Sequence, residues 1–160
     1  MHHFHDQSKV WIYLANRPFT EAETGSINQA ITSFCKEWSA HGTNLKAAGE
    51  IRFNQFIILM VDETAAGASG CSIDKSVRFI QSLERTYDVQ LFNRLLIAIK
   101  EEKEIKLIPL NDFQELIKSG AIHATTLVFN NAVTTKGEMN NTWLLPLKDS
   151  WLGARLSVAV

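Results

Sequence analysis

The chain lacks any long uninterrupted hydrophobic run. The longest comprises residues 56–61, far short of the roughly 20 predominantly apolar residues that a membrane-spanning helix needs. Residues 1–17 include an acidic residue and contain no apolar stretch of about 7 to 15 residues, so they do not have the pattern of a secretory signal peptide. These absences predict a protein with no membrane partner.

Cysteine is scarce, and histidine is not arranged for metal binding. The only cysteines are Cys35 and Cys71, whose separation matches neither a metal site nor a disulfide framework. The N-terminal segment, residues 1–8, carries three histidines without a set of carboxylates around them: His2, His3 and His5. We expect this segment to be flexible, and we predict no metal site, no cofactor and a reduced, cytoplasmic protein.

The chain also lacks an excess of charge of either sign. Lys and Arg number 16 against 17 Asp and Glu, which gives a net charge of −1, so no overall field attracts nucleic acid or an anionic membrane surface. Hydrophobic residues make up 46% of the 160 residues, which is typical of a soluble globular protein. No Pro/Gly/Ser-rich linker divides the chain, and we predict one domain spanning residues 1–160.

Hydrophobic periodicity predicts the order strand, helix, strand, strand, helix, strand. The expected strands are residues 10–14, 45–53, 55–62, 95–99 and 105–110, and the expected helices begin after Thr20 and after the loop 67–72. This order is that of a ferredoxin-like split βαβ core, βαββαβ, extended by a hairpin strand and a third helix that ends at Gly120. We therefore predict an α+β fold with a mainly antiparallel sheet, an inner strand at residues 56–61, and the first two helices on one face.

A loop of small residues, GASGCS at 67–72, connects the longest apolar run to an amphipathic helix. The N–H groups at the start of a helix are free to bind an anion. The sequence therefore indicates Ser69, Gly70 and Ser72 as candidates for binding an unidentified small-molecule or anionic ligand. A P-loop does not fit, because the positions around Lys75 that require glycine hold Ser69 and Asp74.

Nucleophilic chemistry at the same loop is the enzymatic alternative. Cys71 lies where a helix start favours a thiolate, His41 in the WSAHG turn could act as a base, and Asp74 is a third candidate catalytic residue. The structural alternative is a small residue packed where helix meets sheet, with Ser69 or Ser72 as the N-cap and His41 as a helix C-terminal residue.

A resemblance to a known family spans residues 11–151. It is carried by VWIYLANRPFT, the WSAHG turn with Leu45 and Lys46, ASGCSIDKSVRFIQSLE, FNR and VFNN. These segments resemble a family of uncharacterised bacterial proteins often labelled "ABC transporter ATPase", a label that implies ATP hydrolysis. The chain has neither a Walker A motif nor an ABC signature such as LSGGQ, so we expect that it neither binds nor hydrolyses ATP. The resemblance points to WSAHG and ASGCSID as places for a site.

Two function classes follow from these patterns. The first is a non-enzymatic ligand-binding or interaction protein, and the alternative is a small enzyme that uses Cys71 with His41. We also predict a homodimer, because Trp11 and Tyr13 alternate with apolar residues while a single helical layer covers only one face of the sheet. The C-terminal segment 143–151 could cover the other face instead.

Overall fold

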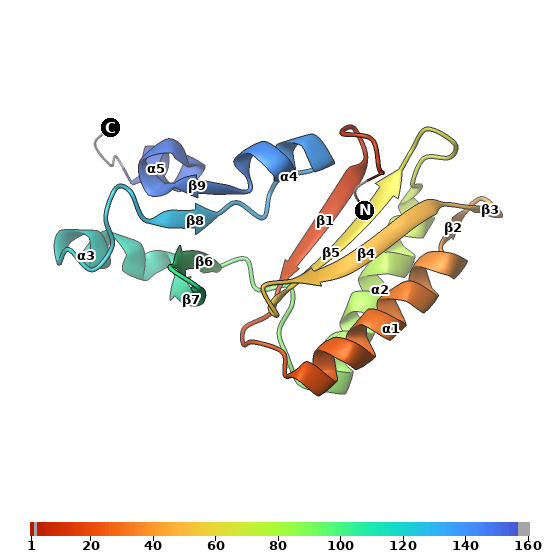
Figure 1. Ribbon diagram of the computed structural model, residues 1–160, viewed down its shortest axis with the longest axis horizontal. Helices are drawn as coiled ribbons and strands as arrows, with labels where there is room; N and C mark the ends of the chain where they lie inside the picture. Colours follow the sequence, from red (N-terminus) through yellow and green to blue (C-terminus); the bar gives the residue numbers. More distant parts are fainter. Residues whose placement is uncertain (2, 157–160) are drawn as a thin grey trace.

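The computed structural model describes residues 1 and 3–156, which form two larger antiparallel sheets, a two-stranded hairpin and five α-helices (Figure 1). The first sheet contains β1 (Lys9–Leu14), β4 (Lys46–Arg52) and β5 (Phe56–Asp62). The second contains β6 (Leu96–Glu101), β7 (Glu104–Pro109), β8 (Leu127–Phe129) and β9 (Leu144–Pro146). The helices are α1 (Glu21–Glu37), α2 (Gly70–Tyr87), α3 (Phe113–Lys118), α4 (Lys136–Thr142) and α5 (Trp151–Arg155). The smaller elements are β2 (Ser39–Ala40), β3 (Thr43–Asn44), η1 (Leu110–Asp112) and η2 (Leu147–Asp149). The predicted α+β class with antiparallel sheets is confirmed.

The first sheet has the strand order β1, β5, β4, with β5 in the middle. Both neighbours run antiparallel to β5, so that Trp11 and Gly49 lie on either side of Leu59. Every residue of β5 is buried, because a strand covered on both faces has no solvent side and needs no polar alternation. The inner strand predicted at residues 56–61 is confirmed.

Helices α1 and α2 cover one face of this sheet (Figure 1). Helix α1 begins at a capping box in which the Glu23 N–H donates to the Thr20 hydroxyl and the Thr20 N–H donates to the Glu23 carboxylate. Ile27 and Ile31 of α1 pack with Ile80 of α2 in the cluster beneath the two helices. This is the arrangement predicted from the two apolar helical stripes.

The second sheet covers the opposite face of the first. Phe56, Ile58 and Met60 of β5 share a buried cluster with Ala98 of β6 and with Trp143. The rings of Phe56 and Trp143 meet edge to face with 5.2 Å between their centroids. The chain therefore covers by itself the apolar face that motivated the expected homodimer, and part of that cover comes from segment 143–151.

The second sheet has the strand order β7, β6, β8, β9. Strands β6 and β7 form the hairpin predicted from the two apolar runs that flank the charged EEKE segment. Phe113 of α3 and Leu152 of α5 are buried against Ile99 of β6. Helix α3 is the predicted third helix, and Gly120 follows it with a φ of 78°, a conformation that favours glycine.

The fourth strand of a ferredoxin-like sheet would lie beside β1, on the side away from β5. Strand β6 pairs instead with β7 and β8, so the ferredoxin-like core is not confirmed. Directly after α2 the chain contacts the end of β1, where the Asn16 N–H donates to the Gln90 carbonyl at 3.1 Å. It then leaves for the second sheet, where Ala98 and Ile99 become fully buried in an inner strand.

The N-terminal segment lies against the cluster that joins the two sheets. Phe4 is buried in that cluster, and the Lys136 N–H donates to the Ser8 carbonyl at 2.9 Å. His2 lies outside the described residues, and the flexibility expected of residues 1–8 stays a prediction.

Candidate functional site

The predicted ligand-binding loop ends in the N-cap of α2. The Ser72 N–H donates to the Ser69 hydroxyl at 3.2 Å, and the Ser69 N–H donates to the Ser72 hydroxyl at 2.7 Å. The Ser72 hydroxyl also donates to the Ser69 carbonyl at 2.8 Å, and Ser72 is fully buried. Both hydroxyls therefore satisfy the helix start itself, which is the structural alternative that the sequence left open.

The loop before this cap is held by its own carboxylate. The Ala68 N–H donates to the Glu63 carboxylate at 3.1 Å, so this N–H is used within the chain and is not available to an anion. Gly70 is exposed, and a Cβ added to it would meet no atom within 4 Å. No described atom packs against Gly70, so the fold itself does not require glycine at this position.

The WSAHG turn lies next to the start of α2. The Trp38 indole N–H donates to the Ser72 carbonyl at 2.8 Å, and the Lys75 ammonium lies 3.5 Å from the Ser39 hydroxyl. These contacts join β2 to the first turns of α2. They hold the two segments together, and none of them involves a catalytic candidate.

The three catalytic candidates are all exposed. His41 lies at the tip of the β2–β3 hairpin with a φ of 50°, while Cys71 and Asp74 are exposed on the first two turns of α2. Within the described part of the chain, no hydrogen bond or ion pair joins His41 to Cys71 or Asp74. The proximity of the two segments thus does not assemble a nucleophile with its base.

An ion pair between a buried carboxylate and an exposed lysine lies at the far end of β5. The Lys46 ammonium is 2.7 Å from the Asp62 carboxylate, and the Thr64 N–H donates to the same carboxylate at 3.1 Å. These hydrogen bonds, first from Lys46 and then from Thr64, lower the pKa of Asp62 to about 2. A carboxylate held in its charged form suits a structural role better than proton transfer near neutral pH.

A cleft of about 930 Å³ lies along the free edge of β1, and we call it the β1 cleft. Trp11, Tyr13, Ile73 and Val77 line its helix side, together with Phe92. The side toward the second sheet is lined by Ile12, Leu14, Leu96, Phe129, Val133 and Trp151. Phe92 and Trp151 stay 40% and 41% exposed, so large apolar side chains face the open cleft.

A few polar groups also line the β1 cleft. Asn130 and Asn131 face it from the loop after β8, and Lys9 and Arg94 bring positive charge. Lys9 and Arg94 are both exposed, and neither forms an ion pair with any described residue. This apolar wall with a few polar groups matches the usual composition of a ligand site.

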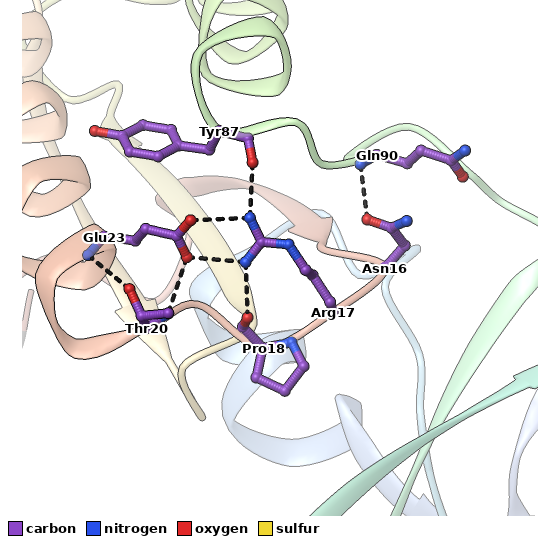
Figure 2. A network of polar contacts seen from close by, with 7 residues as sticks. All are labelled: Asn16, Arg17, Pro18, Thr20, Glu23, Tyr87 and Gln90. Carbon is purple, nitrogen blue, oxygen red and sulfur yellow. Dashed lines mark hydrogen bonds and ion pairs between the residues drawn. The ribbon is translucent and has the colours of Figure 1, made fainter.

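A polar network joins the segment after β1 to the start of α1 and the end of α2 (Figure 2). The Arg17 guanidinium donates two hydrogen bonds of 2.9 Å to Glu23 and one of 2.7 Å to the Tyr87 carbonyl at the end of α2. Beside it, the Gln90 N–H donates to the Asn16 side chain at 2.8 Å. Arg17, and then the Thr20 N–H, lower the pKa of Glu23 to about 2.

Sequence reasoning missed the β1 cleft because its walls come from segments far apart in the chain. Tyr13 and Phe92 meet edge to face with 5.4 Å between ring centroids, yet a strand residue and a loop residue so distant share no local pattern. The available signal was the alternation of Trp11 and Tyr13 in the first strand, which the sequence analysis assigned to a dimer interface.

Metal and membrane features are absent from the described residues. Within residues 1 and 3–156, no group of three or more His, Cys, Asp or Glu side chains could hold a metal ion. No helix of this part of the chain has the length and apolar character needed to cross a membrane.

No protein-family model, curated protein or solved structure matches the chain significantly. The resemblance to proteins labelled "ABC transporter ATPase" therefore stays a prediction from the quoted motifs.

Proposed function

We infer that the chain is a non-enzymatic binding module and that its ligand occupies the β1 cleft. The observation that carries this conclusion is a cleft of about 930 Å³ with exposed aromatic side chains on its walls. This volume lies within the range of about 300–1,000 Å³ that is usual for ligand pockets. Exposed Phe92 and Trp151 gain burial when an apolar ligand enters.

The enzymatic alternative, Cys71 with His41, receives less support. The cap of α2 uses the hydroxyls of Ser69 and Ser72 internally, and no described group orients His41. A nucleophile needs a base within hydrogen-bond reach and a group that positions the base. The binding module is therefore the function that the geometry supports best.

Three narrower proposals accompany this function. The unit β1–α1–β4–β5–α2 has the pairing of the first five elements of a ferredoxin-like fold, with the place of the fourth strand open. A homodimer would need a surface other than the covered face of the first sheet. A cytoplasmic location suits two cysteines that are both unpaired, Cys35 and Cys71.

The test uses the fluorescent probe 1-anilinonaphthalene-8-sulfonate, which combines an apolar ring system with one negative charge. We expect saturable binding, and a severalfold weaker affinity for Phe92→Ala. Phe53→Ala is the matched control, because Phe53 is 45% exposed against 40% for Phe92 but lies outside the β1 cleft. Equal affinities of the two variants would place the probe elsewhere and reject the proposed site.

A further inference from the structure

The backbone of β1 alternates between its paired and its free side. The Val10 N–H points away from β5, because it donates to the Thr134 carbonyl at 2.9 Å, and the Asn16 N–H points the same way toward Gln90. In an antiparallel sheet every second residue directs both its N–H and its C=O to the same neighbour. Ile12 and Leu14, which lie between these two positions, therefore direct their N–H and C=O groups into the β1 cleft.

No described residue completes these four backbone groups. On this side of β1, backbone hydrogen bonds are formed at Val10 and at Asn16, and none is formed by the described residues between them. Unpaired N–H and C=O groups in a row are a template for another strand. The free stretch admits a strand of about five residues, since each residue of a strand advances about 3.3 Å.

Apolar side chains lie on both sides of this free edge. Trp11 and Tyr13 project toward the helix layer, where Ile73 and Val77 of α2 face the β1 cleft. Ile12 and Leu14 project toward the second sheet, and Phe129 faces the β1 cleft from there. Because side chains of a strand alternate between its two faces, a strand seated here meets apolar walls at consecutive positions.

Two positive charges at the β1 cleft favour acidic residues at the ends of such a strand. Lys9 lies at one end of the free edge and Arg94 lines the same cleft, and both are exposed and without an ion pair among the described residues. The Glu63 carboxylate, which also lines the β1 cleft, already accepts from the Ala68 N–H. Acidic residues at both ends of the strand complement the two cations in either strand direction.

A second copy of the chain does not fit this edge. In each copy, Gln90 lies beside Asn16 and Thr134 lies beside Val10. If two β1 strands paired about a twofold axis, Gln90 of each copy would collide with Thr134 of the other. The segments that carry them both lie in the line of the added strand. A single extended peptide has no such flanking segments.

We propose that the β1 cleft binds an extended peptide of apolar residues with acidic flanks, which adds a strand to β1 through the backbone of Ile12 and Leu14. This inference rests on the proposed function and names the ligand class. The peptide takes the place that the fourth strand holds in a ferredoxin-like sheet. Backbone hydrogen bonds supply the affinity, and the apolar walls and the two cations supply the selectivity.

The test uses a fluorescein-labelled peptide, Glu-Asp-Val-Ile-Val-Ile-Val-Asp-Glu, and fluorescence anisotropy with the full chain. We expect saturable binding that weakens at least fivefold in Phe92→Ala and in Arg94→Gln. Phe53→Ala and Arg78→Gln serve as matched controls outside the β1 cleft and keep the original affinity. Affinities that fall equally in the controls overturn the assignment of the peptide to this cleft.

A second peptide separates strand addition from simple apolar binding. N-methylation of the five central amides keeps every side chain and removes the backbone donors, and we expect at least a tenfold loss of affinity. In parallel, the original peptide slows amide hydrogen exchange at Ile12 and Leu14 at least tenfold. An N-methylated peptide that binds as well as the original, or unchanged exchange at both amides, overturns the proposal.

The outcomes distinguish this inference from the proposed function. If the fluorescent probe binds in a Phe92-dependent manner while the original peptide does not bind, strand addition is wrong and the ligand site stands. If neither binds, both are wrong. If Ile12 and Leu14 become protected with increasing protein concentration in the absence of peptide, a second copy is the occupant and the peptide proposal is rejected.

Discussion

Replacing Gly49 by alanine tests how closely α1 packs on the first sheet. A Cβ at this position of β4 would lie 2.5 Å from the Ile31 Cγ2 and 2.9 Å from both the Ile58 carbonyl oxygen and the Leu59 Cδ2. Carbon atoms pack best at about 3.5–4.0 Å, so the added methyl group overlaps its nearest neighbour by roughly 1 Å. The neighbours must move if alanine is to fit.

None of these neighbours moves easily. Ile31 is fully buried on α1, and isoleucine in a helix strongly prefers one χ1 rotamer. The Ile58 carbonyl belongs to the inner strand β5, which is paired on both sides. We therefore expect α1 to shift, at the cost of about 1–3 kcal/mol that is typical of an overpacked core. For a chain of this length that corresponds to roughly 2–12 °C in the melting temperature.

Gly25→Ala is the matched control. Gly25 lies in α1, and an added Cβ meets nothing within 4 Å. Alanine in a helix interior is favoured over glycine by about 0.5–1 kcal/mol, so this variant is expected to be more stable than the original chain. Urea unfolding followed by far-UV circular dichroism measures both variants, with the midpoints compared at a common slope. Gly49→Ala at or above the stability of Gly25→Ala would refute the close packing of α1 on β4.

Three further predictions concern the ionisation of Asp62, the reactivity of the two cysteines and the binding of ATP. The pKa of Asp62 is lowered from its ordinary 3.8 to about 2 by Lys46, so the stabilisation from the ionised carboxylate is complete above about pH 4 and is lost as the pH falls toward about 2. The free energy of unfolding should therefore depend less steeply on pH in Asp62→Asn than in the original chain between these values. Equal slopes would contradict the ion pair. Iodoacetamide should label exposed Cys71 alone in the folded protein, since burial raises the pKa of Cys35 to about 11; intact mass spectrometry showing two adducts before unfolding would disprove this difference. Calorimetry with Mg-ATP should give no saturable heat, and micromolar binding that is lost in Lys75→Ala would show the motif argument to be wrong.

The sequence predicted the elements whose signals are local. The capping box of Thr20 and Glu23 lies within one turn, the apolar run at residues 56–61 specifies burial on both faces, and the charged EEKE segment marks a hairpin. Each of these follows from the spacing of neighbouring residues. Whether these elements form depends little on the rest of the chain.

Pairing between distant strands could not be predicted in the same way. The periodicity of residues 96–101 says that a strand forms, but not whether its edge prefers β1 or β8. That choice depends on which surface buries more apolar area, and in the second sheet Ala98 and Ile99 are almost fully covered. The ferredoxin-like core was expected from element order alone, which contains no information on this competition.

The candidate loop shows a similar limit. The spacing of Ser69 and Ser72 equals that of a capping box, with serine in place of the usual Glu or Gln, so the sequence did contain a signal that both hydroxyls serve the helix. The cleft beside β1 had no such signal. It depends on the register that brings Phe92 to Tyr13 and Thr134 to Val10.

The buried cluster between the two sheets has a consequence for synthesis on the ribosome. Strands β1 and β5 and both long helices are complete once residue 87 has emerged, so the first sheet and its helix layer can assemble early. Met60 and Ile58 then face water until β6, β8 and Trp143 follow. During this interval the nascent chain presents an apolar sheet face and an open strand edge, the two features by which chaperones and aggregating chains engage an incomplete fold.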